Sequence, residues 1–116
     1  MNMRALYEFE KNLIDRVAES ISGEAGVQLR LDARAASAVD CYSDYSKVSF
    51  IIDGYERPLY RGQRQFPAEI RAFDSDEEEL TLNLYGDSNG RLFELEVIRW
   101  GGGQVISPRW DSLSIF

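Results

Sequence analysis

The chain has 116 residues, of which 44% are hydrophobic and 28% are charged. A chain of this length closes one hydrophobic core, so we expect a single domain over residues 1–116. Its 13 basic and 20 acidic side chains give a formal net charge of −7, which repels phosphate backbones and argues against nucleic acid as a partner. No apolar run approaches the roughly 18 residues of a membrane span and no signal peptide is recognisable, so we expect a cytoplasmic protein without membrane contact.

Two scarce residue types limit the chemistry that this chain can perform. Histidine is absent, and the only cysteine is Cys41. Without histidine the chain lacks the commonest general base near neutral pH and every Ser-His or Cys-His nucleophile pair. A lone cysteine forms no intrachain disulfide and, without a second thiol or a histidine, builds no zinc site. We therefore expect no cofactor, no bound metal and no enzymatic activity.

The first predicted element is one amphipathic helix over residues 4–21. Apolar residues recur there at steps of three and four, with polar residues between them; they are Leu6, Phe9, Leu13, Val17 and Ile21. The glycines at 23 and 26 end this pattern. Residues 27–31 then alternate between apolar and polar side chains, which predicts a short strand with one wet face.

The rest of the chain predicts short strands joined by turns. They fall at residues 38–42, 47–53, 66–73, 80–85, 91–100, 105–106 and 113–116, with the turn signal at 87–90 making 80–100 a hairpin. Residues 54–65 predict a long loop, made basic by Arg57, Arg61 and Arg64. We expect an α+β fold, in which an N-terminal amphipathic helix packs on a mainly antiparallel β-sheet of five to seven short strands.

An acidic run, DSDEEE, occupies residues 74–79 and opens a C-terminal third that carries nine acidic and three basic side chains. The run lacks the central glycine and the final bidentate glutamate of a calcium loop. Two interpretations stay open. The run is either a solvated turn that keeps the chain soluble or an acidic surface offered to a cationic partner, through Asp74, Asp76, Glu77 and Glu78.

The hairpin adds two further carboxylates, Glu94 and Glu96. They lie two residues apart and so share one face of a strand, with Phe93, Leu95 and Val97 on the other face. We expect them to pair with arginines such as Arg71 or to face a partner. A less favoured alternative is a metal-assisted hydrolase that uses Asp74, Asp76, Glu94 and Glu96.

Aromatic and acidic residues also alternate at residues 40–45, where Asp40, Tyr42, Asp44 and Tyr45 lie. Aromatic anchors beside carboxylates suit an interface with an arginine-rich partner; alternatively, the tyrosines cap the core edge with their hydroxyls in water. Trp100 and Trp110 flank a glycine run and either close the core or line an exposed groove. The 11 arginines against two lysines favour bidentate pairing with carboxylates.

The hairpin resembles a group of small bacterial domains of unknown function that share a D-x-x-G-x-L-F-E-L turn and strand. Here the pattern is matched by Asp87, Gly90, Leu92, Phe93, Glu94 and Leu95. Small acidic domains of this architecture also resemble the immunity proteins of contact-dependent growth inhibition and related toxin systems. This resemblance implies a cytoplasmic protein that binds one cognate toxin domain, often a nuclease with a basic surface, and covers its active site or substrate groove.

Charge and resemblance together predict a monomeric immunity protein with a basic toxin as its partner. The expected partner-binding residues are Asp40, Tyr42, Asp44, Tyr45, Asp74, Asp76, Glu77, Glu78 and Trp100. A different class also fits the sequence, namely an adaptor or subunit that binds another protein, or a second copy of itself, through the edge of the sheet.

Overall fold

A computed structural model describes residues 2–59 and 62–116. Two helices, α1 (Glu8–Ser20) and α2 (Glu24–Ala35), follow a short first strand, and further strands complete the chain. The strands are β1 (Met3–Ala5), β2 (Ala36–Asp40), β3 (Lys47–Ile52), β4 (Arg64–Gln65), β5 (Ile70–Phe73), β6 (Glu79–Gly86), β7 (Leu92–Arg99) and β8 (Arg109–Ile115). Arg61, part of the predicted basic loop, lies outside the described residues.

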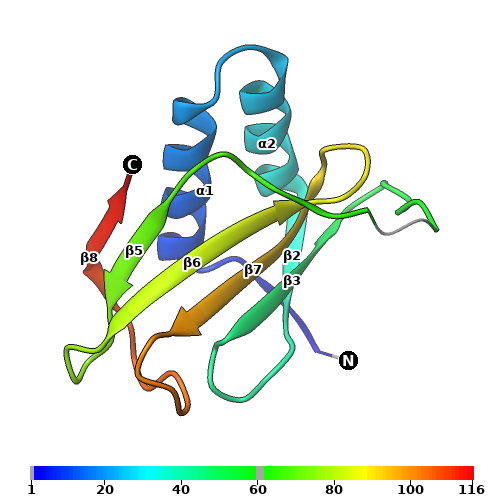
Figure 1. Cartoon of the computed structure of the whole chain (residues 1–116). Coiled ribbons are helices and arrows are strands. Elements are labelled where there is room, and N and C mark those ends of the chain that lie inside the picture. The colour runs from blue at the N-terminus through cyan, green and yellow to red at the C-terminus, as the bar shows by residue number, and fades with distance from the viewer. Residues whose placement is uncertain (1, 60–61) are drawn as a thin grey trace.

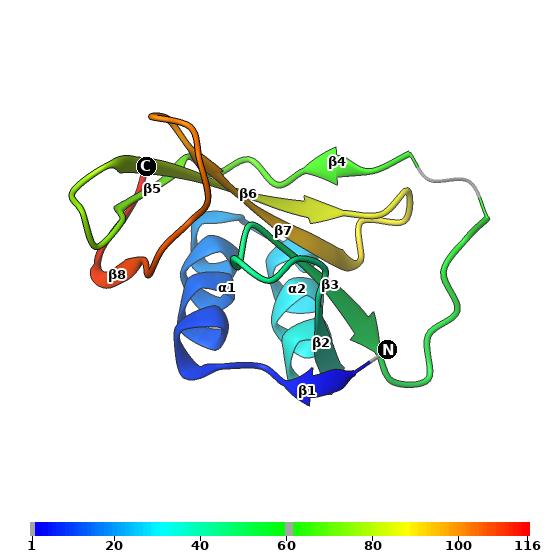
Figure 2. The same ribbon diagram turned by 90° about the horizontal axis from the view of Figure 1, so that it is seen from below.

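All described strands form one antiparallel sheet in the order β1-β2-β3-β7-β6-β5-β8, with β4 beside β6. Figure 1 shows the two helices side by side behind this sheet, and Figure 2 shows that the sheet curls around them from β8 and β5 to β2 and β1. The predicted α+β class and antiparallel sheet are confirmed. The described residues contain eight strands, one more than the upper limit predicted, because β1 and β4 are too short to show a pattern.

The strand predicted at residues 27–31 is wrong, because this segment lies within α2. Leu29 is fully buried, whereas Val27 and Leu31 are 59% and 50% exposed. An alternation over five residues also fits a helix that buries the middle residue and exposes the residues two positions before and after it. Most residues of α2 are strong helix formers, and they decide the local structure.

Gly26 does not end a helix as predicted; it lies inside α2, where the helix crosses α1. A Cβ atom at this position would lie 2.6 Å from the carbonyl oxygens of both Ala18 and Ile21. Only glycine allows this backbone approach. The residue that separates the helices is Gly23, whose φ of +78° favours glycine. The first helix is also shorter than predicted, because residues 3–5 pair with β2.

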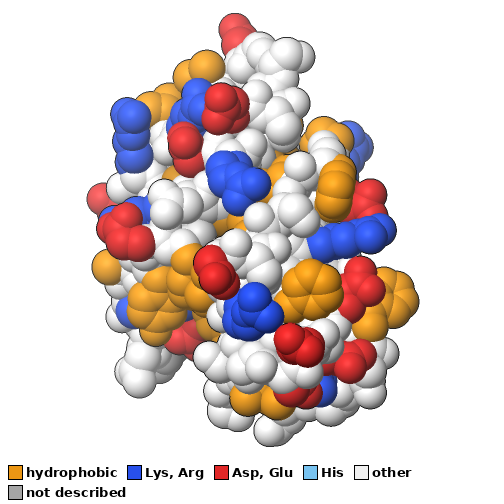
Figure 3. Space-filling model, turned by 90° about the vertical axis from the view of Figure 1, so that its left-hand side faces the viewer, with side chains coloured by type: hydrophobic (Ala, Val, Ile, Leu, Met, Phe, Trp, Pro, Cys, Tyr) orange, Lys and Arg blue, Asp and Glu red, His pale blue; other side chains and the backbone are white. Residues whose placement is uncertain are grey.

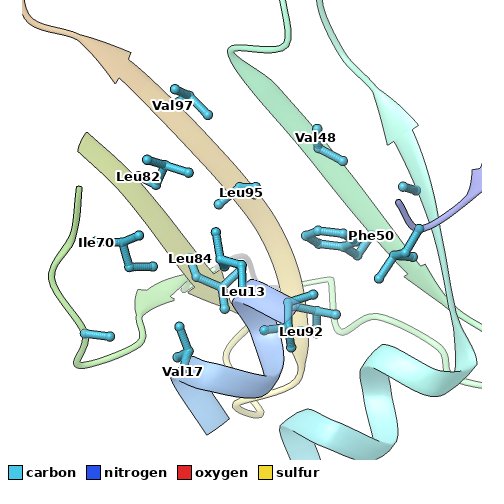
Figure 4. Packing of buried hydrophobic residues seen from close by; sticks show 14 of the residues in the cluster. Leu13, Val17, Val48, Phe50, Ile70, Leu82, Leu84, Leu92, Leu95 and Val97 are labelled. Atoms are coloured by element: carbon cyan, nitrogen blue, oxygen red, sulfur yellow. The ribbon is translucent and has the colours of Figure 1, made fainter. Parts of the chain in front are cut away.

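One hydrophobic core lies between the helices and the concave face of the sheet. Figure 4 shows Leu13 and Val17 of α1 pointing toward the leucines of β6 and β7, and Phe50 of β3 pointing into the same layer. The alternation of β6 buries Leu80, Leu82 and Leu84, so the convex face of the sheet, which we call the open face, carries the polar residues of each strand. Within the described part of the chain, neither helix has the length and apolarity required to span a bilayer.

The β6–β7 hairpin is confirmed, but its strand faces differ from the prediction in one place. The register shifts between Tyr85 and Gly86, so that Leu92 lies opposite Gly86 and Glu94 lies opposite Tyr85. This β-bulge buries Leu92 in the core and moves Phe93 out of it, to a position under the Arg57 guanidinium. The strand predicted at residues 105–106 is also wrong: that segment is irregular, and β8 begins at Arg109.

Candidate partner-binding surface

Three segments that are distant in sequence meet at one end of the sheet. They are the β2–β3 loop (residues 41–46), the β5–β6 loop (74–78) and the segment after β7 (100–107), and we call them together the acidic end. Figure 1 shows them along the lower edge of the sheet. Hydrogen bonds join them: the Asp44 carboxylate accepts from the backbone N–H of Val105 at 3.1 Å, and Asp74 accepts from that of Ser107 at 2.7 Å.

Asp74 holds two of these segments together from inside. Its side chain is fully buried and accepts hydrogen bonds from the N–H groups of Ser75, Ile106 and Ser107 and from the Arg99 guanidinium. Burial opposes ionisation of this carboxyl, but the backbone donors and Arg99 outweigh it, so the pKa of Asp74 lies below its usual range. A partner cannot touch a buried carboxylate, so Asp74 supports the surface and does not form part of it.

The rest of the acidic run divides into paired and unpaired charges. Asp76 receives two hydrogen bonds from Arg99, at 2.8 and 2.6 Å, and these lower the pKa of Asp76 to about 2. Within the described chain, Glu77 and Glu78 form no ion pair. The Glu78 side chain lies against Gly101, where a Cβ atom would collide with its carboxylate. Two negative charges of the run are therefore left for a partner.

Two aromatic side chains are exposed at this end. Trp100 is 66% exposed and Tyr42 is 58% exposed. The Trp100 indole Nε1–H donates to the Thr81 hydroxyl at 2.7 Å, which fixes the ring on the open face. Trp110 instead packs on Phe9, with ring centroids 3.8 Å apart. Of the two roles considered for the tryptophans, Trp110 therefore has the first, covering the core, and Trp100 has the second, lying on the surface.

Tyr45 and Asp40 belong to a charge network that is centred on a buried glutamate and lies next to this surface. Glu10 is fully buried, and Arg4 bridges it to Asp40 with an N–O distance of 2.8 Å to each carboxylate. The hydroxyl of Tyr45 also donates to Glu10 and is not left in water. Burial, followed by the Glu10 charge, raises the pKa of Tyr45 well above its usual range, and the Arg4 hydrogen bond lowers that of Asp40. Tyr45 thus ties the β2–β3 loop to α1, and Asp40 ties β2 to Arg4 of β1, which in turn binds Glu10 of α1.

The sequence analysis missed Glu10 as the centre of this network. Glu10 accepts from the Tyr7 backbone N–H at 2.7 Å, as a glutamate in the first turn of a helix often does. The same position makes it the acceptor for Arg4 at 2.8 Å. A glutamate three residues after a helix start was the available signal, but the predicted helix began too early for it to be recognised.

The four carboxylates of the hydrolase alternative do not share one site, because they do not all bind the same partner. Asp74 and Asp76 both bind Arg99, whereas Glu94 lies 3.5 Å from the Lys47 ammonium and Glu96 accepts from the hydroxyl of Tyr85 at 3.0 Å. Among residues 2–59 and 62–116, no three His, Cys, Asp or Glu side chains gather closely enough to hold a metal ion. The pairing predicted with Arg71 is wrong, because Arg71 binds Glu69 and Glu79.

Charges of both signs are mixed over much of the surface. Figure 3 shows basic, acidic and hydrophobic side chains interspersed on the side of β8 and β5, with acidic ones gathering toward the lower end. The bidentate pairing predicted from the arginine excess is found at Arg4, Arg91 and Arg99. The acidic end itself carries five carboxylates, and among residues 2–59 and 62–116 only the guanidinium of Arg99 pairs with any of them.

Residues 3–108 match the model of a protein family described as a domain of unknown function, DUF6984, and the chain belongs to this family. The match covers both helices and every strand except β8. Neither the curated proteins nor the solved structures contain a significant match to the chain.

Proposed function

We propose that this chain is an immunity protein, which binds a cognate basic toxin domain through the acidic end and covers its active site or substrate groove. One observation carries the proposal: the acidic end contains two exposed aromatic side chains, Tyr42 and Trp100, and also Glu77 and Glu78, which form no ion pair with any residue that the structure describes. The immunity role itself comes from the resemblance of small acidic domains of this architecture to that class.

The charges of the acidic end suit a cationic partner. Five carboxylates against one guanidinium give this end a local excess of negative charge. Such a field attracts a basic protein before contact and raises the association rate. In a nuclease-type toxin, the same field occupies the space intended for a phosphate backbone.

Trp100 supplies the centre of the proposed contact. Its ring is fixed by the bond to Thr81, and the following residue, Gly101, lies against the Glu78 carboxylate. A guanidinium of the partner can stack on the indole and pair with Glu78, combining a cation–π contact with an ion pair. Buried aromatic anchors of this kind dominate the energy of protein interfaces.

The loops of the acidic end are held in place before any partner binds. Asp44 bonds to Ser46 and to Val105, and Asp74 joins residues 106 and 107 to the β5–β6 loop. A preformed surface loses less conformational entropy on binding than a flexible one. The proposal is therefore one of binding without catalysis, in the cytoplasm and with the chain as a monomer.

Co-expression with the protein encoded directly upstream tests this function. We expect that protein, expressed alone, to arrest growth, and we expect this chain to restore growth and to co-purify with it. A harmless neighbour that still co-purifies would contradict the immunity role and favour an adaptor or subunit that uses the same surface. Failure to co-purify would contradict both.

Charge-reversal and truncation variants test the surface. Glu77→Lys with Glu78→Lys should slow association with the basic partner about tenfold or more at low salt, and Trp100→Ala should speed dissociation by about a hundredfold. The matched control is Glu19→Lys with Glu24→Lys, two exposed glutamates without ion pairs in the described chain and at the α1–α2 turn. An equal decrease of the association rate in both double variants would show that the net charge of the chain, and not the acidic end, determines association.

A further inference from the structure

A second concave site lies away from the acidic end and shares no residue with it. It is a cavity of about 540 Å³ between α1, α2 and the link from β1 to α1. The helices approach closely where Gly26 meets the carbonyl oxygens of residues 18 and 21. Toward their other ends, small side chains line the space between them, those of Ala33 and Ala36 among them, and these leave the cavity open.

The cavity is positively charged on a chain whose net charge is −7. Lys11, Arg30 and Arg34 line it together with one carboxylate, that of Asp15, which gives a local charge of +2. The carboxamide of Asn12 adds a hydrogen-bonding group. Concave sites concentrate the electric field of the charges that line them. This cavity therefore attracts anions, whereas the acidic end attracts cations.

Lys11 forms an ion pair with Glu8 at 3.5 Å, but the hydrogen-bonding capacity of the two arginines is largely unused. Arg34 forms neither an ion pair nor a hydrogen bond with the described residues. Arg30 gives only its Nε–H to Asp15, at 2.8 Å, so neither of its terminal nitrogens bonds to a described residue. The two arginines lie one helical turn apart on α2, where like charges repel each other and destabilise the helix. An anion between them would remove this repulsion.

We propose that this cavity binds a compact phosphate-bearing anion. Two guanidiniums on one helix face match the oxygens of a phosphate group in geometry, and a dianion matches the local charge. The buried Leu6 and the alanines provide apolar surface for a small organic group attached to the phosphate. This inference is independent of the proposed immunity function, because it uses other residues and another ligand.

Titration of the ¹⁵N-labelled chain with inorganic phosphate and with phenyl phosphate, at constant ionic strength, tests the site. We expect saturable shifts of the backbone amides of Ala33 and Ala36, with phenyl phosphate binding several-fold more tightly than phosphate. Arg34→Gln should weaken binding about tenfold. The matched control is Arg64→Gln, an exposed arginine of β4 without an ion pair in the described chain, and it should leave binding unchanged.

Two further variants separate a built site from general charge attraction. Asp15→Asn frees Arg30 and should tighten binding a few-fold, whereas Asp111→Asn, with the same change of charge on β8, should not. Ala33→Leu fills the cavity but keeps every charge, and it should abolish the shifts while the rest of the spectrum stays dispersed. Unsaturable shifts, or equal effects of Arg34→Gln and Arg64→Gln, would overturn the proposal.

Discussion

Two ends of the sheet use buried aspartates in the same way but differ in their remaining charges. At the hairpin end, the β6–β7 turn (residues 87–91) is held by Asp32 and Asp87, and each carboxylate has its own arginine, Arg91 and Arg57. At the acidic end, Asp74 holds the loops together in the same way. Its cation, Arg99, is shared with Asp76, so the carboxylates of this end outnumber the guanidinium that pairs with them. Folding thus requires neutralised pairs at both ends.

This difference between the two ends distinguishes charged groups that stabilise the fold from charged groups that the fold does not require. A loop clamp is complete once a buried carboxylate has its cation and its backbone donors. At the hairpin end, both carboxylates, those of Asp32 and Asp87, are paired in this way. The acidic end has in addition the exposed ring of Trp100 and the carboxylates of Glu77 and Glu78, which have no ion-pair partner in the described part of the chain. Neither the core nor the loops require these side chains. This surplus is the physical reason for assigning the binding surface to the acidic end.

The largest expected effect is the loss of a clamp at the hairpin end. Asp32→Ala leaves the Arg91 guanidinium and the Leu92 N–H without the carboxylate that binds them at 2.8 and 3.0 Å, and should lower the free energy of unfolding by about 3 kcal/mol. Urea denaturation measures this loss. The control Asp15→Ala breaks an exposed pair with Arg30 and should cost about 0.5 kcal/mol; similar losses would show that burial does not distinguish the two pairs.

Acid should weaken the ion pair between Asp76 and Arg99 at the acidic end in a defined pH range. The Arg99 hydrogen bonds lower the pKa of Asp76 from 3.8 to about 2. A carboxyl with a lowered folded-state pKa contributes stability that is complete above pH 3.8 and is lost as the pH falls toward 2. Asp76→Asn should therefore lower the melting temperature at pH 6, and the difference from the wild type should shrink between pH 4 and pH 2. A difference that stays constant with pH would contradict this assignment.

The sequence predicted those elements whose pattern is long and local. The alternation of residues 80–84 and the turn at 87–90 define the hairpin, and both are found. The alternation at 27–31 was too short to separate a strand from a helix, so α2 was missed. The strand β1 was missed because three residues carry no period, and its pairing with β2 is a long-range event.

The candidate surface was predictable as a composition but not as an arrangement. Acids near aromatic residues pointed to residues 40–45, 74–78 and 100, and the fold brings these segments to one end. Which acids are free depends on the position of Arg99, more than twenty residues away in sequence. Local sequence does not encode that position, so Asp74 was expected on the surface and is buried. The basic cavity was missed for the same reason, because its cations come from two helices.

The smallest expected effect is the most informative about the comparison between the two ends. Glu77→Lys with Glu78→Lys changes the net charge from −7 to −3 but breaks no ion pair of the described chain, so the free energy of unfolding should change by no more than about 0.5 kcal/mol. Urea denaturation at low and at moderate salt measures this change. A loss of about 2 kcal/mol or more would mean that these glutamates support the β5–β6 loop, and the surplus at the acidic end would then belong to the fold. An unchanged free energy of unfolding combined with slower association would show that Glu77 and Glu78 serve binding and not folding. Asp74, a few residues away, should show the opposite behaviour, because its replacement should lower the free energy of unfolding.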